Sequence, residues 1–297
     1  MHSDRIADTR AWARSVLGPV ELLELKVRPW AVTWQAGPAF VKASTVHTGH
    51  EAAVLQVLTR ACPQLVPDLI AADPPHHRLI VASAGTVLRE LHSGEKFDLA
   101  VWIPLVQQFA QLQRAVMPYV DELLAQGVPD ERPHRHLDLL QDFVTAPQLP
   151  PAERDRLARI AEKWDAGRQW LVPPSLQHGD LHDNNVAVDA AGVSRFFDFG
   201  DSSVAHPFST MDLPLSFAQE DKVDTRRLED AYLEVFTDLA PLSELRAELQ
   251  AVIAVAPLQR ARNWLRALST DTPGVAWDPK AAQEWDHPIE YWLNCLR

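Results

Sequence analysis

The sequence predicts an α+β protein of two lobes, in which an antiparallel sheet with one helix precedes a mostly helical lobe. Short runs of β-type residues, separated by turn residues, occupy much of residues 21–83. From Asp98 onward, apolar residues recur at helical spacing. The chain of 297 residues is long enough for two lobes with separate cores. We expect residues 1–84 to form the first lobe and residues 85–297 the second.

The first lobe is predicted from its strand-like runs and two helical patterns. A short amphipathic helix comes first, over residues 4–17, and Gly18 ends it. A second helix begins at Glu51 and runs to Thr59. Strands are expected at residues 21–27, 31–35, 39–43, 68–72 and 78–83.

The second lobe is predicted from apolar residues at helical spacing and from stop residues. Helices are expected at residues 104–116, 119–126, 134–144, 152–164, 225–239 and 242–269. Pro257 predicts a kink in the last of these. The tail begins with Asp278 and Pro279, a cap followed by a first-turn proline. We assign Asp130 and Glu131 to a solvent-facing loop.

A hairpin is predicted within residues 177–201, which read QHGDLHDNNVAVDAAGVSRFFDFGD. Two β-type runs, at residues 186–188 and 193–197, flank the turn Asp-Ala-Ala-Gly. If Val188 pairs with Val193, residues 183–185 lie across from residues 196–198.

The same hairpin gathers polar side chains at its open end. Asn185 and Asp198 would lie side by side there, and Asp180 would lie just beyond. Hard oxygen ligands and a further carboxylate suit Mg²⁺ and a phosphate-bearing substrate. The segment is therefore the candidate site.

Two motifs in this segment carry a resemblance to a known family. His-Gly-Asp-Leu-His-x-x-Asn begins at His178, and Asp-Phe-Gly-Asp begins at Asp198. Together they resemble the catalytic core of aminoglycoside phosphotransferases and of choline-kinase-type small-molecule kinases, which share the protein-kinase-like fold. The resemblance is specific over residues 177–201, and the order of elements extends it over most of the chain. It implies transfer of the γ-phosphate of ATP, or of GTP, to a hydroxyl group of a small molecule, with ATP and Mg²⁺ as cofactors.

The resemblance implies roles for the polar residues of the segment. Asp180 would accept or orient the proton of the acceptor hydroxyl. Asn185 and Asp198 would ligate Mg²⁺. His178 is expected to fix the loop by hydrogen bonds. His182 and Asp183 would face the acceptor or complete the loop, and we favour the second; Asp201 would stabilise the turn or support the metal site.

The resemblance also implies a nucleotide site in the first lobe. Lys42 would bridge the α- and β-phosphates; as an alternative, it would be a solvent-facing lysine that protects a strand edge. Glu51 would orient Lys42, or would form a capping box with Thr48. Residues 82–85 would be the hinge, where backbone groups of Ala82 and Ala84 would meet adenine.

One departure from the family pattern concerns the loop that should cover the phosphates. No glycine occurs from Pro19 to Ala36, and the connection reads Arg-Pro-Trp. Pro29 has no backbone N–H to offer a phosphate. The departure is compatible with a second interpretation, a catalytically inactive kinase-like protein that binds a nucleotide or a partner.

Other classes fit the sequence less well. A metal-dependent phosphoesterase would require a Gly-Asn-His block, and the chain contains no Gly-Asn pair. A protein kinase would require His-Arg-Asp and Ala-Pro-Glu motifs, and both are missing from the sequence.

The amino-acid composition limits the classes of partner that this protein can bind. The net charge is −12, and residues 171–297 hold 20 acidic against 10 basic residues. This balance argues against nucleic acid or an anionic membrane as a partner. The N-terminus has no apolar signal core, the apolar runs are too short to span a bilayer, and the two cysteines lack metal-site spacing, so we expect a cytoplasmic protein.

The acidic second lobe also suggests the acceptor. Four tryptophans lie in its last part: Trp264, Trp277, Trp285 and Trp292. Carboxylates pair with ammonium groups, and tryptophan faces stack on sugars or cations. The hypothesis is a cationic small-molecule acceptor, such as an amino sugar or an aminoglycoside; core packing of the tryptophans is the alternative.

Overall fold

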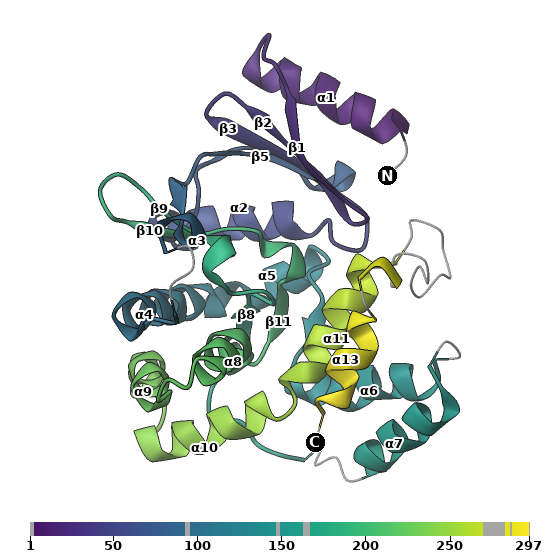
Figure 1. Ribbon diagram of the computed structural model, residues 1–297, viewed down its shortest axis with the longest axis vertical. Coiled ribbons are helices and arrows are strands. Elements are labelled where there is room, and N and C mark those ends of the chain that lie inside the picture. Colours follow the sequence, from purple (N-terminus) through teal and green to yellow (C-terminus); the bar gives the residue numbers. More distant parts are fainter. Residues whose placement is uncertain are drawn as a thin grey trace.

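The computed structural model describes residues 3–92, 96–146, 149–162, 167–269, 283–285 and 287–296. It confirms the predicted fold class, since an antiparallel five-stranded sheet lies above a mostly helical part (Figure 1). The strand order in this sheet is β1-β2-β3-β5-β4. Its strands are β1 (Leu23–Arg28), β2 (Ala31–Ala36), β3 (Ala39–Ser44), β4 (Leu69–Asp73) and β5 (Arg78–Ala82).

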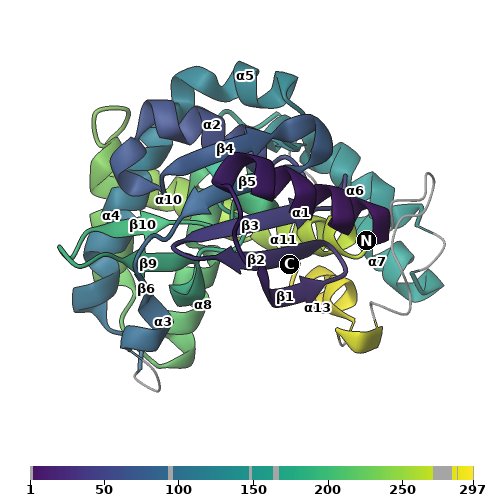
Figure 2. The same cartoon turned by 90° about the horizontal axis from the view of Figure 1, so that it is seen from above.

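Both faces of this sheet are covered. Helix α1 (Ser3–Leu17) crosses the outer face, as seen from above in Figure 2, and helix α2 (Glu51–Ala61) lies beneath the inner face. The two faces take alternate residues of β5: Ile80 packs with Trp34 in the outer cluster, while Leu79 joins the core that includes α2. Burial on both faces explains why the inner strands are apolar almost throughout.

The helical part contains the predicted helices and several short elements that the sequence did not reveal. Helix α4 begins after Asp98, whose side chain accepts a hydrogen bond from the Ala100 N–H at 2.8 Å. The helices are α3 (Leu88–Leu91), α4 (Leu99–Val116), α5 (Val120–Ala125), α6 (His136–Val144), α7 (Pro151–Glu162), α8 (Asp212–Glu220), α9 (Arg226–Leu233), α10 (Leu242–Ile253), α11 (Ala256–Ala267) and α13 (Pro288–Asn294).

Six short strands complete this part. They are β6 (Thr86–Val87), β7 (Asp130–Glu131), β8 (Ser175–Gln177), β9 (Val186–Val188), β10 (Ser194–Phe196) and β11 (Ser203–Ala205), and they form two three-stranded sheets. Except for the hairpin strands β9 and β10, they were not predicted, because two or three residues are too few to display a period.

The helix predicted over residues 242–269 with a kink at Pro257 is instead two helices. The chain breaks between α10 and α11, and Pro257 lies in the first turn of α11, where a missing N–H costs little. The predicted cap at Asp278 and Pro279 lies outside the described residues, as do residues 163 and 164 of the predicted helix over 152–164.

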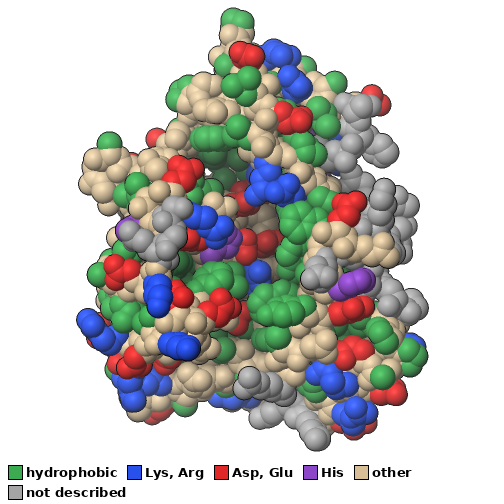
Figure 3. Space-filling model, viewed as in Figure 1, with side chains coloured by type: hydrophobic (Ala, Val, Ile, Leu, Met, Phe, Trp, Pro, Cys, Tyr) green, Lys and Arg blue, Asp and Glu red, His purple; other side chains and the backbone are tan. Residues whose placement is uncertain are grey.

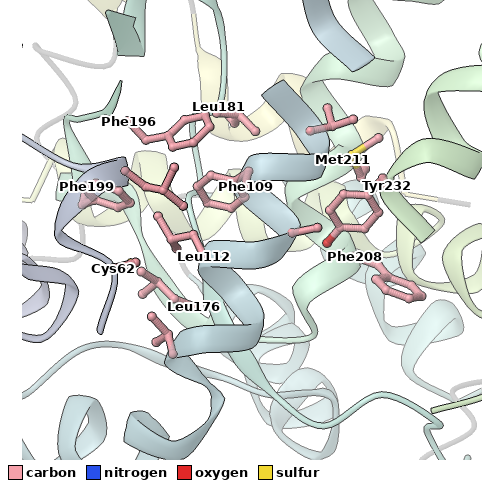
Figure 4. Close-up of a cluster of buried hydrophobic side chains, with 14 of the residues drawn as sticks. Cys62, Phe109, Leu112, Leu176, Leu181, Phe196, Phe199, Phe208, Met211 and Tyr232 are labelled. Atoms are coloured by element: carbon pink, nitrogen blue, oxygen red, sulfur yellow. The ribbon is translucent and has the colours of Figure 1, made fainter. Parts of the chain in front are cut away.

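The largest core is built around α4 (Figure 4). Phe109 of this helix contacts Phe196 of the hairpin edge to face, with ring centroids 5.0 Å apart. Phe199, which follows Asp198, is fully buried in the same cluster and packs on His178 at 4.8 Å. Both motifs of the functional segment are therefore anchored on one buried helix.

Candidate active site

The predicted hairpin forms, with a register that differs by one residue. Val188 pairs with Ser194 and not with Val193. Val193 is instead opposite Asp189, since the Asp189 N–H donates to the Val193 carbonyl at 3.0 Å. The Asp189 side chain accepts the N–H groups of Ala191 and Val193, both at 2.9 Å. The open end is unaffected by this shift, since Phe197, the neighbour of Asp198, bonds to the Asn185 carbonyl at 3.0 Å.

The loop before the hairpin is held by Gly179 and His178. Gly179 has a φ of +81°, and a Cβ there would lie 2.1 Å from the Asp201 carbonyl oxygen, so only glycine fits. His178 Nδ1 accepts the Asp180 N–H at 3.3 Å, and its Nε2 donates to the Phe197 carbonyl at 3.1 Å. Burial lowers the pKa of His178 to about 4, so the ring is neutral. These contacts agree with the expected loop-fixing histidine.

Three donors hold the Asp180 carboxylate. Its Oδ2 accepts from His182 Nε2 and from Asn185 Nδ2, each at 3.1 Å. Its Oδ1 lies 3.1 Å from Nη1 of Arg260. Burial alone would raise the pKa of Asp180, but the hydrogen bond from His182 and the charge of Arg260 outweigh it and hold that pKa well below its usual range. Asp180 is therefore an ionised, oriented carboxylate.

His182 and Asp183 are also tied to the loop. His182 Nδ1 accepts the Asn184 N–H at 3.1 Å, which leaves Nε2 to donate to Asp180. Asp183 pairs with Arg89 of α3 at 2.7 Å. Both residues therefore have structural contacts, in line with the interpretation that they complete the loop.

Lys42 of β3 lies between two carboxylates. Its Nζ is 2.6 Å from Glu51 and 2.5 Å from Asp198. Burial would lower the pKa of Lys42, but the two carboxylates outweigh burial and raise it. Glu51 also accepts the Phe199 N–H at 3.1 Å, so one glutamate links α2, β3 and the second motif. Lys42 is thus not a solvent-facing edge lysine.

The capping box considered for Glu51 does not form. Thr48 Oγ1 donates to the Trp30 carbonyl at 3.1 Å, and no side chain caps α2. The reason is that the buried Glu51 carboxylate turns to Lys42 and away from the backbone of Thr48.

The residues expected to hold Mg²⁺ suit that ion. Asn185 Nδ2 donates a hydrogen bond to the Asp180 backbone carbonyl at 2.8 Å. The amide oxygen of Asn185 is therefore available to accept from, or to coordinate, another group. Asp198 has a φ of +63°, an uncommon backbone conformation outside glycine, and its side chain is 40% exposed. In the described part of the chain, no group of three or more His, Cys, Asp or Glu could hold a metal by itself. One amide and one carboxylate oxygen fit Mg²⁺, which commonly relies on substrate phosphates for further ligands.

The hinge has fewer free backbone N–H groups for adenine than expected. The Ala82 N–H donates to the Asp68 carbonyl at 2.9 Å, and the Ser83 N–H donates to Pro38 at 2.8 Å. Ala82 therefore cannot offer its N–H to adenine without losing a bond of the sheet. The Ala84 N–H has no hydrogen-bond partner among the described residues, so it is the more suitable of the two.

Lys42, Asp180, Asn185 and Asp198 line one cleft of about 120 Å³, whereas Glu51, Ala82 and Ala84 do not line it. Figure 3 shows this face hollowed at its centre, with acidic side chains deep inside the hollow. Helix α11 supplies a wall that sequence reasoning missed. The cleft lining includes Lys42, Asp180, Asn185, Asp198, Arg260, Asn263 and Trp264. The sequence did contain a signal for this wall: Arg260, Asn263 and Trp264 have the spacing i, i+3, i+4, which places them on one helix face.

The carboxylates that follow Asp201, on which the expectation of a cationic acceptor partly rests, do not contribute to this cleft in the described part of the chain. No Asp or Glu described after Asp201 lines the cleft. Three of these carboxylates are engaged elsewhere. Glu248 bonds to His206 at 2.9 Å, and Asp230 and Asp238 pair with arginines away from the cleft.

Of the tryptophans in the last part of the chain, one lines the cleft and two others pack against neighbouring side chains. Trp264 lines the cleft and packs edge to face on Trp30 of the β1–β2 turn, with ring centroids 5.8 Å apart. Trp285 packs on Trp30 at 5.1 Å, and Trp292 lies beneath the Arg260 guanidinium at 5.0 Å. Trp277 lies outside the described residues. The glycine-free connection is thus attached to the helical lobe through Trp30.

Glu131, assigned from the sequence to a solvent-facing loop, is buried. It forms an ion pair with Arg266 of α11 and accepts from Ser203 at 3.1 Å. Arg266 in turn bonds to Asn263, whose Nδ2 donates to the Gly179 carbonyl at 3.2 Å. This network supports the loop that carries Asp180 from below.

A two-lobed kinase-like fold defines the class of protein. Lys42, Asp180, Asn185 and Asp198 are gathered at one cleft, and Glu51 pairs with Lys42. The model of the APH phosphotransferase enzyme family matches residues 35–209, more than half of the chain. The chain belongs to this family.

Solved structures of similar fold include members with different acceptors. An aminoglycoside 2'-phosphotransferase-IIIa in complex with GDP is 14% identical, with a TM-score of 0.62 over 99% of each chain. A macrolide 2'-phosphotransferase from Brachybacterium faecium is 15% identical, with a TM-score of 0.58 over 100% of this chain and 98% of that one. A choline/ethanolamine kinase family protein from Mesorhizobium loti is 14% identical, with a TM-score of 0.57 over 99% of each chain.

A search of curated protein sequences found no significant relative. Among the described residues, no helix has both the length and the apolar character needed to cross a membrane.

Proposed function

We propose that this protein transfers the γ-phosphate of ATP or GTP to a hydroxyl group of a small molecule. The observation that carries the proposal is the ionised Asp180 carboxylate, oriented by three donors in the cleft that also contains the Lys42–Asp198 pair. Phosphoryl transfer depends mainly on alignment and charge neutralisation, which such a constellation supplies. Structural neighbours include complexes with GDP and kanamycin and with ATP and streptomycin.

Each residue has a proposed task. Asp180 orients the acceptor hydroxyl and accepts its proton as the phosphate bond forms. Lys42, held by Glu51, binds the α- and β-phosphates, and Ala84 meets adenine. Asn185 and Asp198 hold Mg²⁺, which when bound neutralises charge between the phosphates. The lobe boundary is proposed at residues 84 and 85, next to this hinge.

A cationic acceptor, such as an amino sugar or an aminoglycoside, is one candidate acceptor class. It is supported by the neighbour that binds kanamycin and by the three carboxylates of the cleft, Asp180, Asp198 and Asp201. A neutral acceptor remains compatible with the same reaction, because the transfer requires only a hydroxyl group.

The second candidate is a kinase-like protein that binds a nucleotide without transferring phosphate. One observation favours it: the connection that should cover the phosphates contains no glycine and is attached through Trp30 to Trp264 and Trp285. The intact set of Lys42, Asp180, Asn185 and Asp198 favours the active enzyme.

The test is a phosphotransfer screen of the purified protein with MgATP and with MgGTP. The panel contains aminoglycosides, amino sugars, amino alcohols, macrolides and neutral sugars, and release of ADP or GDP is measured. With a proven acceptor, Asp180→Asn is expected to lower kcat by about 10²–10⁴-fold. Asp238→Asn is the control, since Asp238 pairs with Arg114 away from the cleft.

Nucleotide binding separates the two candidates. Thermal stabilisation by MgATP at millimolar concentration without turnover of any acceptor would favour the inactive protein. The absence of both stabilisation and turnover, with either nucleotide, would contradict both.

A further inference from the structure

Arg260 of α11 lies directly beside the carboxylate oxygen that an acceptor must approach. Its Nη1 is 3.1 Å from Asp180 Oδ1 and also donates to the Gly179 carbonyl. The guanidinium lies over the Trp292 ring, 5.0 Å from the centroid, and the side chain is only 11% exposed. The cation is therefore fixed by loop backbone and by an aromatic ring as well as by Asp180.

A second set of polar groups lies near Arg260. A small cavity of about 10 Å³ is lined in part by Arg260, Gln177, Asp212 and Gln259. Each of the last three has a buried oxygen that no described residue satisfies. Three unsatisfied acceptor oxygens that share a buried cavity with Arg260 favour a cation at this position, whether or not an acceptor occupies the cleft.

The hydrogen bonds of Asp180 restrict where the acceptor hydroxyl can bind. Oδ2 already accepts from His182 and Asn185, whereas Oδ1 accepts from Arg260 alone. A hydroxyl that donates to Asp180 therefore finds its place at Oδ1, next to the guanidinium. Any group on the carbon next to that hydroxyl then lies within a few ångströms of a fixed positive charge.

We propose that Arg260 determines acceptor specificity: the reacting hydroxyl is flanked by a neutral or anionic hydrogen-bond acceptor, such as a hydroxyl, carbonyl or carboxylate group, and not by an ammonium group. The inference rests on the proposed phosphotransfer, and among the acceptor classes named for it, it favours a neutral acceptor over an amino sugar whose ammonium group is next to the reacting hydroxyl. A carboxylate or hydroxyl beside the reacting group accepts from the guanidinium, while an ammonium is repelled by it. Trp264 and Trp30 on the same cleft add aromatic faces on which a sugar ring can pack.

The test uses matched acceptors that differ in one group. The first set is glucose, glucuronate and glucosamine; the second is glycerol, glycerate and 2-amino-1,3-propanediol. Initial rates with MgATP give kcat/KM, and tryptophan fluorescence in the presence of MgADP gives Kd without turnover. The wild-type protein is expected to prefer the neutral and anionic members over the ammonium member by at least tenfold in both measurements.

Variants of two neighbouring arginines isolate the effect. Arg260→Gln is expected to reduce that preference at least tenfold, and Arg260→Lys, which keeps the charge, is expected to retain most of it. Arg262→Gln is the matched control on the same helix, because Arg262 pairs with Asp142 at 2.8 Å and does not line the cleft. Thermal melting of each variant verifies that it is folded.

The outcomes separate the two proposals. Preferential binding of neutral and anionic probes, lost in Arg260→Gln, supports the role of Arg260 even if no probe is phosphorylated, and in that case the proposed reaction fails alone. Efficient turnover with a preference for ammonium probes, or an unchanged preference in Arg260→Gln, overturns the role of Arg260 while the reaction stands. Failure of every probe to bind also counts against the proposed specificity.

Discussion

Gly179 shows how closely single residues determine the geometry at Asp180. Its positive φ and the position of the Asp201 carbonyl oxygen, 2.1 Å from where a Cβ would be, leave no room for another residue. Gly127 has a similar φ of +83°, but no atom lies within 4 Å of the place that its Cβ would take. A substitution at Gly127 therefore measures the cost of backbone strain alone, without a steric clash.

We predict that Gly179→Ala destabilises the protein well beyond Gly127→Ala. Gly127→Ala should lower the free energy of unfolding by about 1–2 kcal/mol, the cost of a left-handed residue with a Cβ. Gly179→Ala should cost at least about 2 kcal/mol more, because backbone must move, and phosphotransfer should fall with it. Urea unfolding curves and ADP release measure both effects; equal costs at the two positions would contradict the steric argument.

Glu51 gives a second prediction at this scale. Glu51→Gln retains the shape of the side chain but removes the charge that holds Lys42. We expect kcat/KM for ATP to fall by about tenfold or more, because Lys42 is less well positioned for the phosphates. In the matched variant Glu122→Gln, the lost partner is Arg60 on the surface, and activity should not change. Full activity in Glu51→Gln would mean that Asp198 alone is enough to position Lys42.

Among the elements, the β1–β2 turn departs furthest from what its position in the fold suggests. Its Trp30 packs against both Trp264 and Trp285, which also contact each other, and Arg28 lies over Trp285 at 5.3 Å. The Trp30 carbonyl also accepts from the Thr45 N–H at 2.9 Å. The turn therefore ties the sheet to helix α11 at the wall of the cleft.

We predict that Trp30→Ala weakens the coupling between the lobes. Truncating this half-buried ring should cost about 2–3 kcal/mol, less than a fully buried tryptophan, and should broaden or split the thermal unfolding transition. Trp12→Ala is the control, because Trp12 packs on Arg78 within the sheet lobe and should lower Tm without broadening the transition. A single sharp transition in Trp30→Ala would show that the lobes are coupled by other contacts.

For the whole molecule, buried neutral histidines set the response to acid. Burial lowers the pKa of His178 and of His136 to about 4, and the pKa of His50 to about 3. An unfolded histidine has a pKa near 6.5. The unfolded state therefore binds more protons below pH 6.5, and stability that is complete above that pH is lost as the pH falls toward the folded values.

We predict that Tm falls steadily between pH 7 and pH 5. Each of these histidines should lower the free energy of unfolding by up to about 2 kcal/mol at pH 5. The buried carboxyls of Asp201 and Asp212, whose pKa burial raises to about 7 and about 6, act in the opposite direction and offset part of this loss. Scanning calorimetry at constant ionic strength measures this dependence. A Tm that is constant or rises over this interval would contradict the burial of neutral histidines.

The local sequence determined the parts of this protein whose signal is local. Alternation and turn residues identified the sheet strands, the helical period identified most helices, and the two motifs placed Asp180, Asn185 and Asp198 at one hairpin end. These patterns are readable because each depends on neighbours within a few residues along the chain. The one-residue error in the hairpin arose from the hydrogen bonds of the Asp189 turn, which residue types alone do not specify.

Only the tertiary structure decided what surrounds those residues. Arg260 reaches Asp180 across 80 positions of sequence, Trp30 of the sheet lobe packs on Trp264 of α11, and Glu131 is buried against Arg266. Such contacts depend on how helices pack against the loop, and no local period encodes that packing. An acidic composition therefore predicted a cationic acceptor, whereas the folded chain directs an arginine to the Asp180 carboxylate. The reason is that net charge is a property of the whole sequence, and the field at a site is a property of its nearest groups.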